Sequence, residues 1–110
     1  MIIGTRILKQ QRGQIKQNIA VRIYAPEKTK ENWICRFDID WPDGKVERWG
    51  TGVDAILALL FALHMIGTQL YASEANKSGE LVWLKEGSGF GFPLPNNIRD
   101  LLVGDDARYL

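Results

Sequence analysis

The feature that most constrains this sequence is a stretch without charged side chains, from Ala55 to Ser73. Asp54 precedes it at the position of a helix N-cap, where a carboxylate accepts hydrogen bonds from the free amides of a first turn. Apolar residues recur through the stretch at helical spacing, so we expect one long apolar helix. The face expected to pack on the rest of the protein comprises Ile56, Leu59, Leu60, Leu63, Ile66 and Leu70.

A run of this length must be considered as a membrane span, because about 20 apolar residues cross a bilayer. His64, Thr68 and Gln69 dilute the run, strand-like sequences flank it, and no basic cluster marks an inner end. We therefore expect no membrane association. The first residues also lack the basic segment and long apolar stretch of a signal peptide, which favours a cytoplasmic location.

The side of the helix opposite the packing face is apolar too, which predicts a helix that is buried on two sides. Gly67 lies near the edge of the packing face and is expected to permit close approach to a sheet. A single small sheet cannot cover both sides, so the far side is expected either to form an interface or to lie under the segment Gly87–Pro95. The candidate interaction residues on this far side are Leu57, Phe61, His64 and Met65.

The sequence before the helix has the two-residue alternation of β-strands. The clearest strand is Trp33–Trp41, whose odd positions are apolar and expected in the core, whereas Arg36, Asp38 and Asp40 are expected in solvent. Together with Ile2–Lys9, Ile15–Ile23 and Lys45–Gly50, this strand predicts a four-stranded antiparallel β-meander.

After the helix, Leu81–Leu84 reads as a short strand and Gly87–Pro95 as irregular or hairpin-like, because its two prolines do not fit a central strand. A short helix is expected over Ile98–Val103, followed by a frayed polar tail from Gly104. The predicted fold class is α+β: one domain over residues 1–110, with the meander packed on one long apolar helix.

The net charge of +1 conceals an asymmetry. Residues 1–30 carry seven bases and one acid, whereas residues 31–54 carry six acids and three bases. We expect basic and acidic strands to pair and neutralise each other, rather than a basic arm that binds nucleic acid. A hairpin closed by the loop Pro26–Lys30 would place Lys16 near Asp40 and Asn18 near Asp38.

Residues that could carry chemistry are few. Cys35 and His64 are the only cysteine and histidine, which excludes an intrachain disulfide and the common zinc sites. Cys35 is expected to be a buried hydrophobe. The glycines of Gly87–Pro95 lack the pattern of a phosphate-binding loop. We expect no catalytic residue, no cofactor and no metal site.

The remaining candidates are carboxylates and tryptophans. Asp38, Asp40 and Asp43 form an acidic strand face that could in principle serve hydrolysis, but an open sheet offers no cleft to shift their pKa values apart. Trp33 and Trp41 belong to the predicted core face. For Trp49 and Trp83, core and functional surface remain equally open.

The helix resembles that of a family of small bacterial proteins of unknown function. The residues that carry the resemblance are Gly52-Val53-Asp54, Ala58-Leu59, Ala62-Leu63, Ile66-Gly67, Leu70-Tyr71 and Gly91-Phe92-Pro93. These are cap, core and turn positions, so the resemblance implies a fold and no chemistry.

The function that these features favour is a non-enzymatic protein-interaction domain, acting as a homodimer or with a protein partner. The alternative is an immunity-type inhibitor that binds a basic toxin through the acidic face of Asp38, Asp40 and Asp43. The sequence indicates no particular small-molecule ligand.

Overall fold

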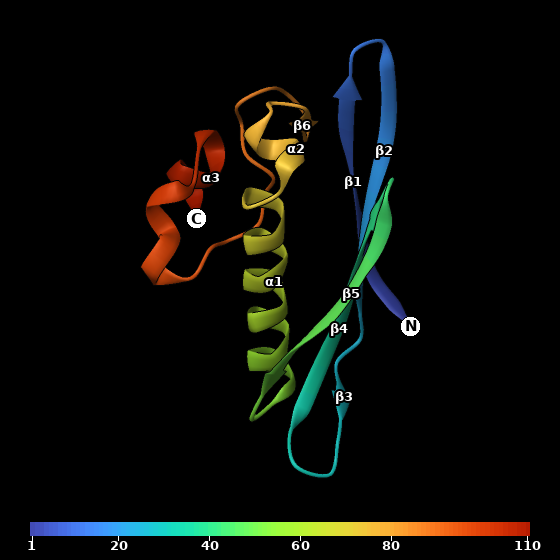
Figure 1. The fold of residues 1–110 in the computed structure, drawn as a ribbon. Helices are drawn as coiled ribbons and strands as arrows, with labels where there is room; N and C mark the ends of the chain where they lie inside the picture. The colour runs from blue at the N-terminus through green and yellow to red at the C-terminus, as the bar shows by residue number, and fades with distance from the viewer.

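The alternating sequence before residue 54 forms most of an antiparallel sheet. In the computed structural model, which describes residues 1–110, four long strands lie side by side in chain order, and two short strands, β3 and β6, add to them (Figure 1). β4 pairs with β2 and β3 along one edge and with β5 along the other, so β5 is an edge strand. The strands are β1 (Ile2–Arg12), β2 (Ile15–Tyr24), β3 (Glu27–Lys28), β4 (Trp33–Trp41), β5 (Gly44–Gly52) and β6 (Leu81–Val82).

The expected pairing of basic and acidic strands is found, but the predicted register was wrong. Lys16 lies opposite Gln11 of β1, and Asp38 lies opposite Arg22. The linker after β2 is not a simple hairpin loop, because part of it forms β3 and pairs with the start of β4. This extra pairing moves the register of β4 along β2 toward the carboxyl end of β2.

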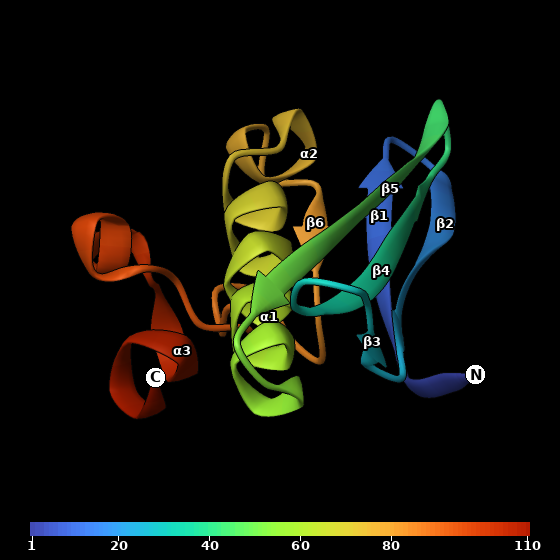
Figure 2. The same ribbon diagram turned by 90° about the horizontal axis from the view of Figure 1, so that it is seen from below.

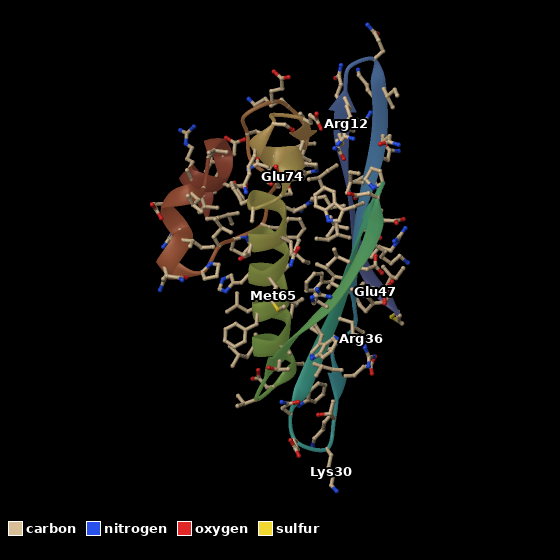
Figure 3. All side chains as sticks on the ribbon, viewed as in Figure 1. Arg12, Lys30, Arg36, Glu47, Met65 and Glu74 are labelled. Atoms are coloured by element: carbon tan, nitrogen blue, oxygen red, sulfur yellow. The ribbon has the colours of Figure 1, made fainter.

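The core lies between the sheet and one long helix. Cys35, Phe37 and Ile39 of β4 are buried, which confirms that the odd positions of this strand face the core. Leu8 of β1 and Ile19 of β2 complete this layer with no accessible surface. Arg36 and Glu47 project from the opposite side of the sheet, away from α1 (Figure 3).

The helix α1 (Ala55–Tyr71) begins where the sequence predicted. The Leu57 amide donates a hydrogen bond of 2.8 Å to Asp54 Oδ1, which confirms the N-cap. The predicted packing face was partly wrong, because Ile56 is 77% exposed and Leu60 is also exposed. The buried positions of α1 are Ala58, Ala62, Ile66, Gly67, Leu70 and Tyr71.

The small residues face the sheet because α1 lies unusually close to β5. A Cβ atom added to Gly50 would lie 2.5 Å from the Ala62 nitrogen, and one added to Gly52 would lie 2.5 Å from the Ala58 nitrogen. Backbone can approach backbone to this extent only where both surfaces lack long side chains. Larger residues of the helix are thereby turned toward its flanks, which decides the orientation of α1.

After α1 the chain returns to the sheet, where β6 pairs with β1, and then passes to the side of the helix away from the sheet with its C-terminal residues (Figure 2). The helix α2 (Glu74–Lys77) and β6 lead to Gly87–Pro95, in which Phe90, Phe92 and Leu94 are buried. This segment covers α1 at Gly67, where an added Cβ would lie 2.2 Å from the Pro93 carbonyl oxygen. Gly67 therefore permits close approach of this segment and not, as predicted, of the sheet.

The C-terminal residues form the 3₁₀ helix η1 (Asn96–Leu101) and the helix α3 (Gly104–Tyr109). The prediction of a frayed tail from Gly104 was wrong, because Asp106 of α3 is buried and hydrogen-bonded. Sheet, α1 and this C-terminal segment make three successive layers (Figures 1 and 2). None of the helices is both long and apolar enough to span a bilayer.

Candidate functional site

An exposed apolar region lies on α1 beside the free edge of strand β5. We call it the β5–α1 surface and define it as Leu57, Phe61, His64 and Met65 of α1 together with the edge of β5 at residues 49–51. Phe61 is 42% exposed, although its side chain is large and apolar. Trp49 is also exposed, but its indole lies on the other face of the sheet with Arg36, because Gly50 and Gly52 are the positions of β5 that face α1. An exposed aromatic side chain beside a free strand edge is typical of an association site.

A groove of about 480 Å³ crosses the free edge of β5 at the centre of this surface. Its β5 wall includes Trp49 and Thr51, and its α1 wall includes Phe61, His64 and Met65. The rings of Phe61 and His64 lie 6.4 Å apart between centroids. Figure 3 shows Met65 on α1, on the side of the sheet opposite Arg36 and Glu47.

The edge of β5 adds a second binding element to this groove. A strand that pairs on one side only leaves a row of backbone N–H and C=O groups available to another chain. β5 pairs with β4 throughout its length and with no strand on its other edge. The surface therefore offers backbone hydrogen-bonding groups and apolar side chains together, as strand-addition sites do.

The four residues predicted for the far side of the helix reach this surface to different degrees. Phe61, His64 and Met65 line the groove, whereas Leu57 is half-buried beside Gly52. The segment Gly87–Pro95 was one predicted cover for this side. It covers the helix near Gly67 and leaves Phe61 exposed.

The three predicted acidic residues do not form one open face. Asp38 is only 3% exposed, so its predicted solvent position was wrong. Arg22 Nη1 donates to Asp38 Oδ1 over 2.9 Å, and the Tyr24 hydroxyl donates to Asp38 Oδ2. Arg22 Nη2 also lies 3.6 Å from Asp40 Oδ2. Asp43 lies apart, in the β4–β5 turn beside Trp41.

This ion pair changes the titration of its partners. The hydrogen bond to Asp38 raises the pKa of Arg22 above its ordinary value. The same carboxylate raises the pKa of Tyr24, because it accepts a hydrogen bond from the protonated phenol and would repel a phenolate. Asp38 is thus a satisfied buried carboxylate, and the arrangement holds β2 against β4.

Several other candidate residues have structural roles. Cys35 is buried as predicted, and burial raises the pKa of its thiol. Trp83 is half-buried beneath Arg6, whose guanidinium carbon lies 4.1 Å from the indole centroid. No group of three or more histidine, cysteine, aspartate or glutamate side chains comes together as a possible metal site.

Sequence reasoning missed two charged residues that meet in the folded chain. Arg6 of β1 and Asp106 of α3 hold the Phe90–Gly91 peptide from opposite sides. One signal was available for Arg6, which lies two residues before Leu8 and so on the same face of β1 as this core residue. No local signal distinguishes Asp106 from Asp105, because only the tertiary fold turns one of them inward.

The comparisons with known proteins identify a family and add no chemistry. The chain belongs to the family described as Domain of unknown function (DUF6968), whose profile matches residues 4–94. No curated protein and no solved structure matches the chain significantly.

Proposed function

We propose that this chain is a non-enzymatic protein-interaction domain and that a second copy of the same chain binds its β5–α1 surface. The observation that supports this proposal is the exposure of Phe61 in a groove beside the unpaired edge of β5. A few aromatic side chains often carry much of the binding energy of an interface, because they fill central pockets from which water is excluded.

The sequence of β5 is compatible with pairing to itself. In a twofold antiparallel pair one residue lies opposite its own copy, and its neighbours oppose each other on either side. An axis at Lys45, Glu47 or Arg48 would place like charges opposite each other, which is destabilising. An axis at Trp49, Gly50 or Thr51 avoids this conflict and centres the pair on the part of β5 that lines the groove. An axis at Val46 also avoids it but lies outside the groove. We therefore place the axis within residues 49–51.

The alternative of an inhibitor that binds through an acidic face has less support. Asp38 is buried and paired with Arg22, so it offers little field to a basic partner. Arg22 also partly neutralises Asp40. The electrostatic steering that this alternative requires depends on exposed, unpaired charge.

The test is the change Phe61→Glu, followed by sedimentation of parent and variant over a range of concentrations. We expect the parent to dimerise and the variant to remain monomeric, with dimer affinity reduced roughly 30-fold or more. Its melting temperature, extrapolated to low concentration, should match that of the parent monomer, because Phe61 lies outside the buried core.

The matched control is Ile7→Glu. Ile7 is 46% exposed on β1, at a similar exposure to Phe61 but away from the β5–α1 surface. This variant should dimerise like the parent. A parent that stays monomeric at high concentration, or a Phe61→Glu variant that dimerises normally, would contradict the proposal.

A further inference from the structure

A buried carboxylate from the C-terminal helix lies among donors supplied by distant parts of the chain. Asp106 is 2% exposed. Its Oδ2 accepts hydrogen bonds from the Tyr71 hydroxyl at 2.6 Å and from the Phe90 amide at 2.7 Å. Its Oδ1 accepts one from the Gly91 amide at 2.8 Å. Two adjacent amides and a hydroxyl thus converge on the two oxygens of a single carboxylate.

Arg6 completes the charge balance from the other side of the same peptide. It donates to the carbonyl oxygens of Phe90 at 3.1 Å and Gly91 at 2.8 Å. The guanidinium also stacks on Trp83 and on Phe92, with its carbon 4.6 Å from the Phe92 centroid. The Phe90–Gly91 peptide therefore lies between a cation at its carbonyl and an anion at its amide. Both hydrogen bonds are charge-assisted, which makes them stronger than neutral ones.

The backbone around this peptide is shaped to admit an anion. Gly89 and Gly91 have φ values of 85° and 75°, which direct successive amides into a concave site. A Cβ added to Gly89 would lie 2.4 Å from Asp106 Cγ, so only glycine leaves room for the carboxylate. The glycines that resembled no phosphate-binding loop in the sequence thus form an anion site in the fold.

The donors and the acceptor belong to different parts of the protein. Arg6, Tyr71, Phe90 and Gly91 all lie within the residues that the family profile matches, whereas Asp106 lies beyond them. Between residues 96 and 110 only Leu102 and Asp106 are buried. Figures 1 and 2 show this C-terminal segment as a separate layer against α1. Asp106 supplies its buried charged contact with the domain, beside the core contact of Leu102 and the hydrogen bond from the Asp105 amide to the Ser88 carbonyl.

We propose that Tyr71 and the amides of Phe90 and Gly91, balanced by Arg6, form a carboxylate-binding site that Asp106 occupies as an internal ligand. Release of residues 96–110 opens the site to a carboxylate of another molecule. Two donors on one oxygen and one on the other suit a planar carboxylate, and the single charge of Arg6 balances a monoanion. This site is separate from the β5–α1 surface, so neither proposal depends on the other.

The first experiment uses the full chain with Asp106→Ala and acetate as the probe. The variant should melt at a lower temperature than the parent, because its amides and hydroxyl lose their acceptor. Acetate should raise this temperature in a saturable manner, whereas chloride at equal ionic strength should not. The parent should not respond, since its site is filled. The variant Asp106→Leu, which fills the same space without oxygen, is the control and should also not respond.

Adding Tyr71→Phe to Asp106→Ala should weaken acetate binding roughly tenfold or more, because a hydrogen bond to a charged oxygen is lost. If Asp106→Ala folds without any saturable response to acetate, the site does not bind carboxylates and the proposal is overturned. The same conclusion follows if Asp106→Leu responds equally.

A second experiment uses the parent and does not depend on the folding of any variant. Hydrogen exchange of residues 96–110 should accelerate when a short peptide with a free C-terminal carboxylate is added. The C-terminally amidated peptide at equal concentration should not accelerate exchange, because it has no free carboxylate. Acceleration by acetate alone would show that a small acid is sufficient. Unchanged exchange with every probe would show that the C-terminal segment is a permanent part of the domain.

Discussion

The close packing of α1 on β5 predicts that one added methyl group will destabilise the fold. In Gly50→Ala the new Cβ would lie 2.5 Å from the Ala62 nitrogen and 2.8 Å from the Ala58 oxygen. Carbon makes favourable contacts with other atoms near 3.5–4.0 Å, so the two backbones must separate by roughly 1 Å. The obstructing atoms belong to backbone, and no side-chain rotation can move them away.

The expected cost follows from this displacement. A gap of about 1 Å removes a quarter to a half of the dispersion energy of the atoms that line it. Overpacked cores lose about 1–3 kcal/mol, and a backbone clash belongs at the upper end. Alanine also restricts the unfolded chain, which returns about 0.4–1 kcal/mol. We expect a net loss of about 2 kcal/mol and, at this chain length, a melting temperature lower by roughly 8 °C.

Thermal and urea unfolding of the parent, Gly50→Ala and Gly4→Ala provide the measurement. Gly4 also lies in a strand, and an added Cβ there would meet nothing within 4 Å. Gly4→Ala should therefore be neutral or slightly stabilising. If Gly50→Ala melts within about 2 °C of the Gly4→Ala control, α1 does not lie against β5 as described and the reasoning is refuted.

Two further predictions concern the helix. Ile66→Ala should lower the free energy of unfolding by about 2–5 kcal/mol, because Ile66 is buried. Ile56→Ala should change it by less than about 0.5 kcal/mol, because Ile56 is exposed. Equal effects of the two changes in urea titrations would contradict this orientation of α1. Burial and the hydrogen bond to Asp106 raise the pKa of Tyr71 above its ordinary value of 10.0, so the folded state retains a proton that the unfolded state releases. Stability should therefore fall as the pH rises above about 10, and Tyr71→Phe should show a smaller loss between about pH 8 and about pH 11; an unchanged pH dependence would exclude Tyr71 as its source.

The sequence alone determined the local structures. The alternation in Trp33–Trp41 indicated the strand and its core face, because a period of two leaves only one face apolar. Asp54 marked the first turn of α1, because the need to cap free amides is local. These features depend on neighbours within a few residues, so no knowledge of the fold was required.

The tertiary structure decided which sides of these elements meet. α1 is apolar nearly all round, so its own pattern could not select a face, and the glycines of β5 selected the alanines. The two glycines of β5 and the two alanines of α1 were visible in the sequence. Neither pair alone predicts close packing, because the close approach requires the glycines to lie opposite the alanines. Asp38 is likewise buried because the register of β2 places Arg22 opposite it.

The same distinction applies to the anion site. Its donors and its carboxylate come from Arg6, Tyr71, the glycine segment and Asp106, which are far apart in the chain. Local periodicity specifies helices and strands because it reflects contacts along the chain. Burial of a single charge reflects the donors that other segments bring to it, and only the assembled structure supplies them.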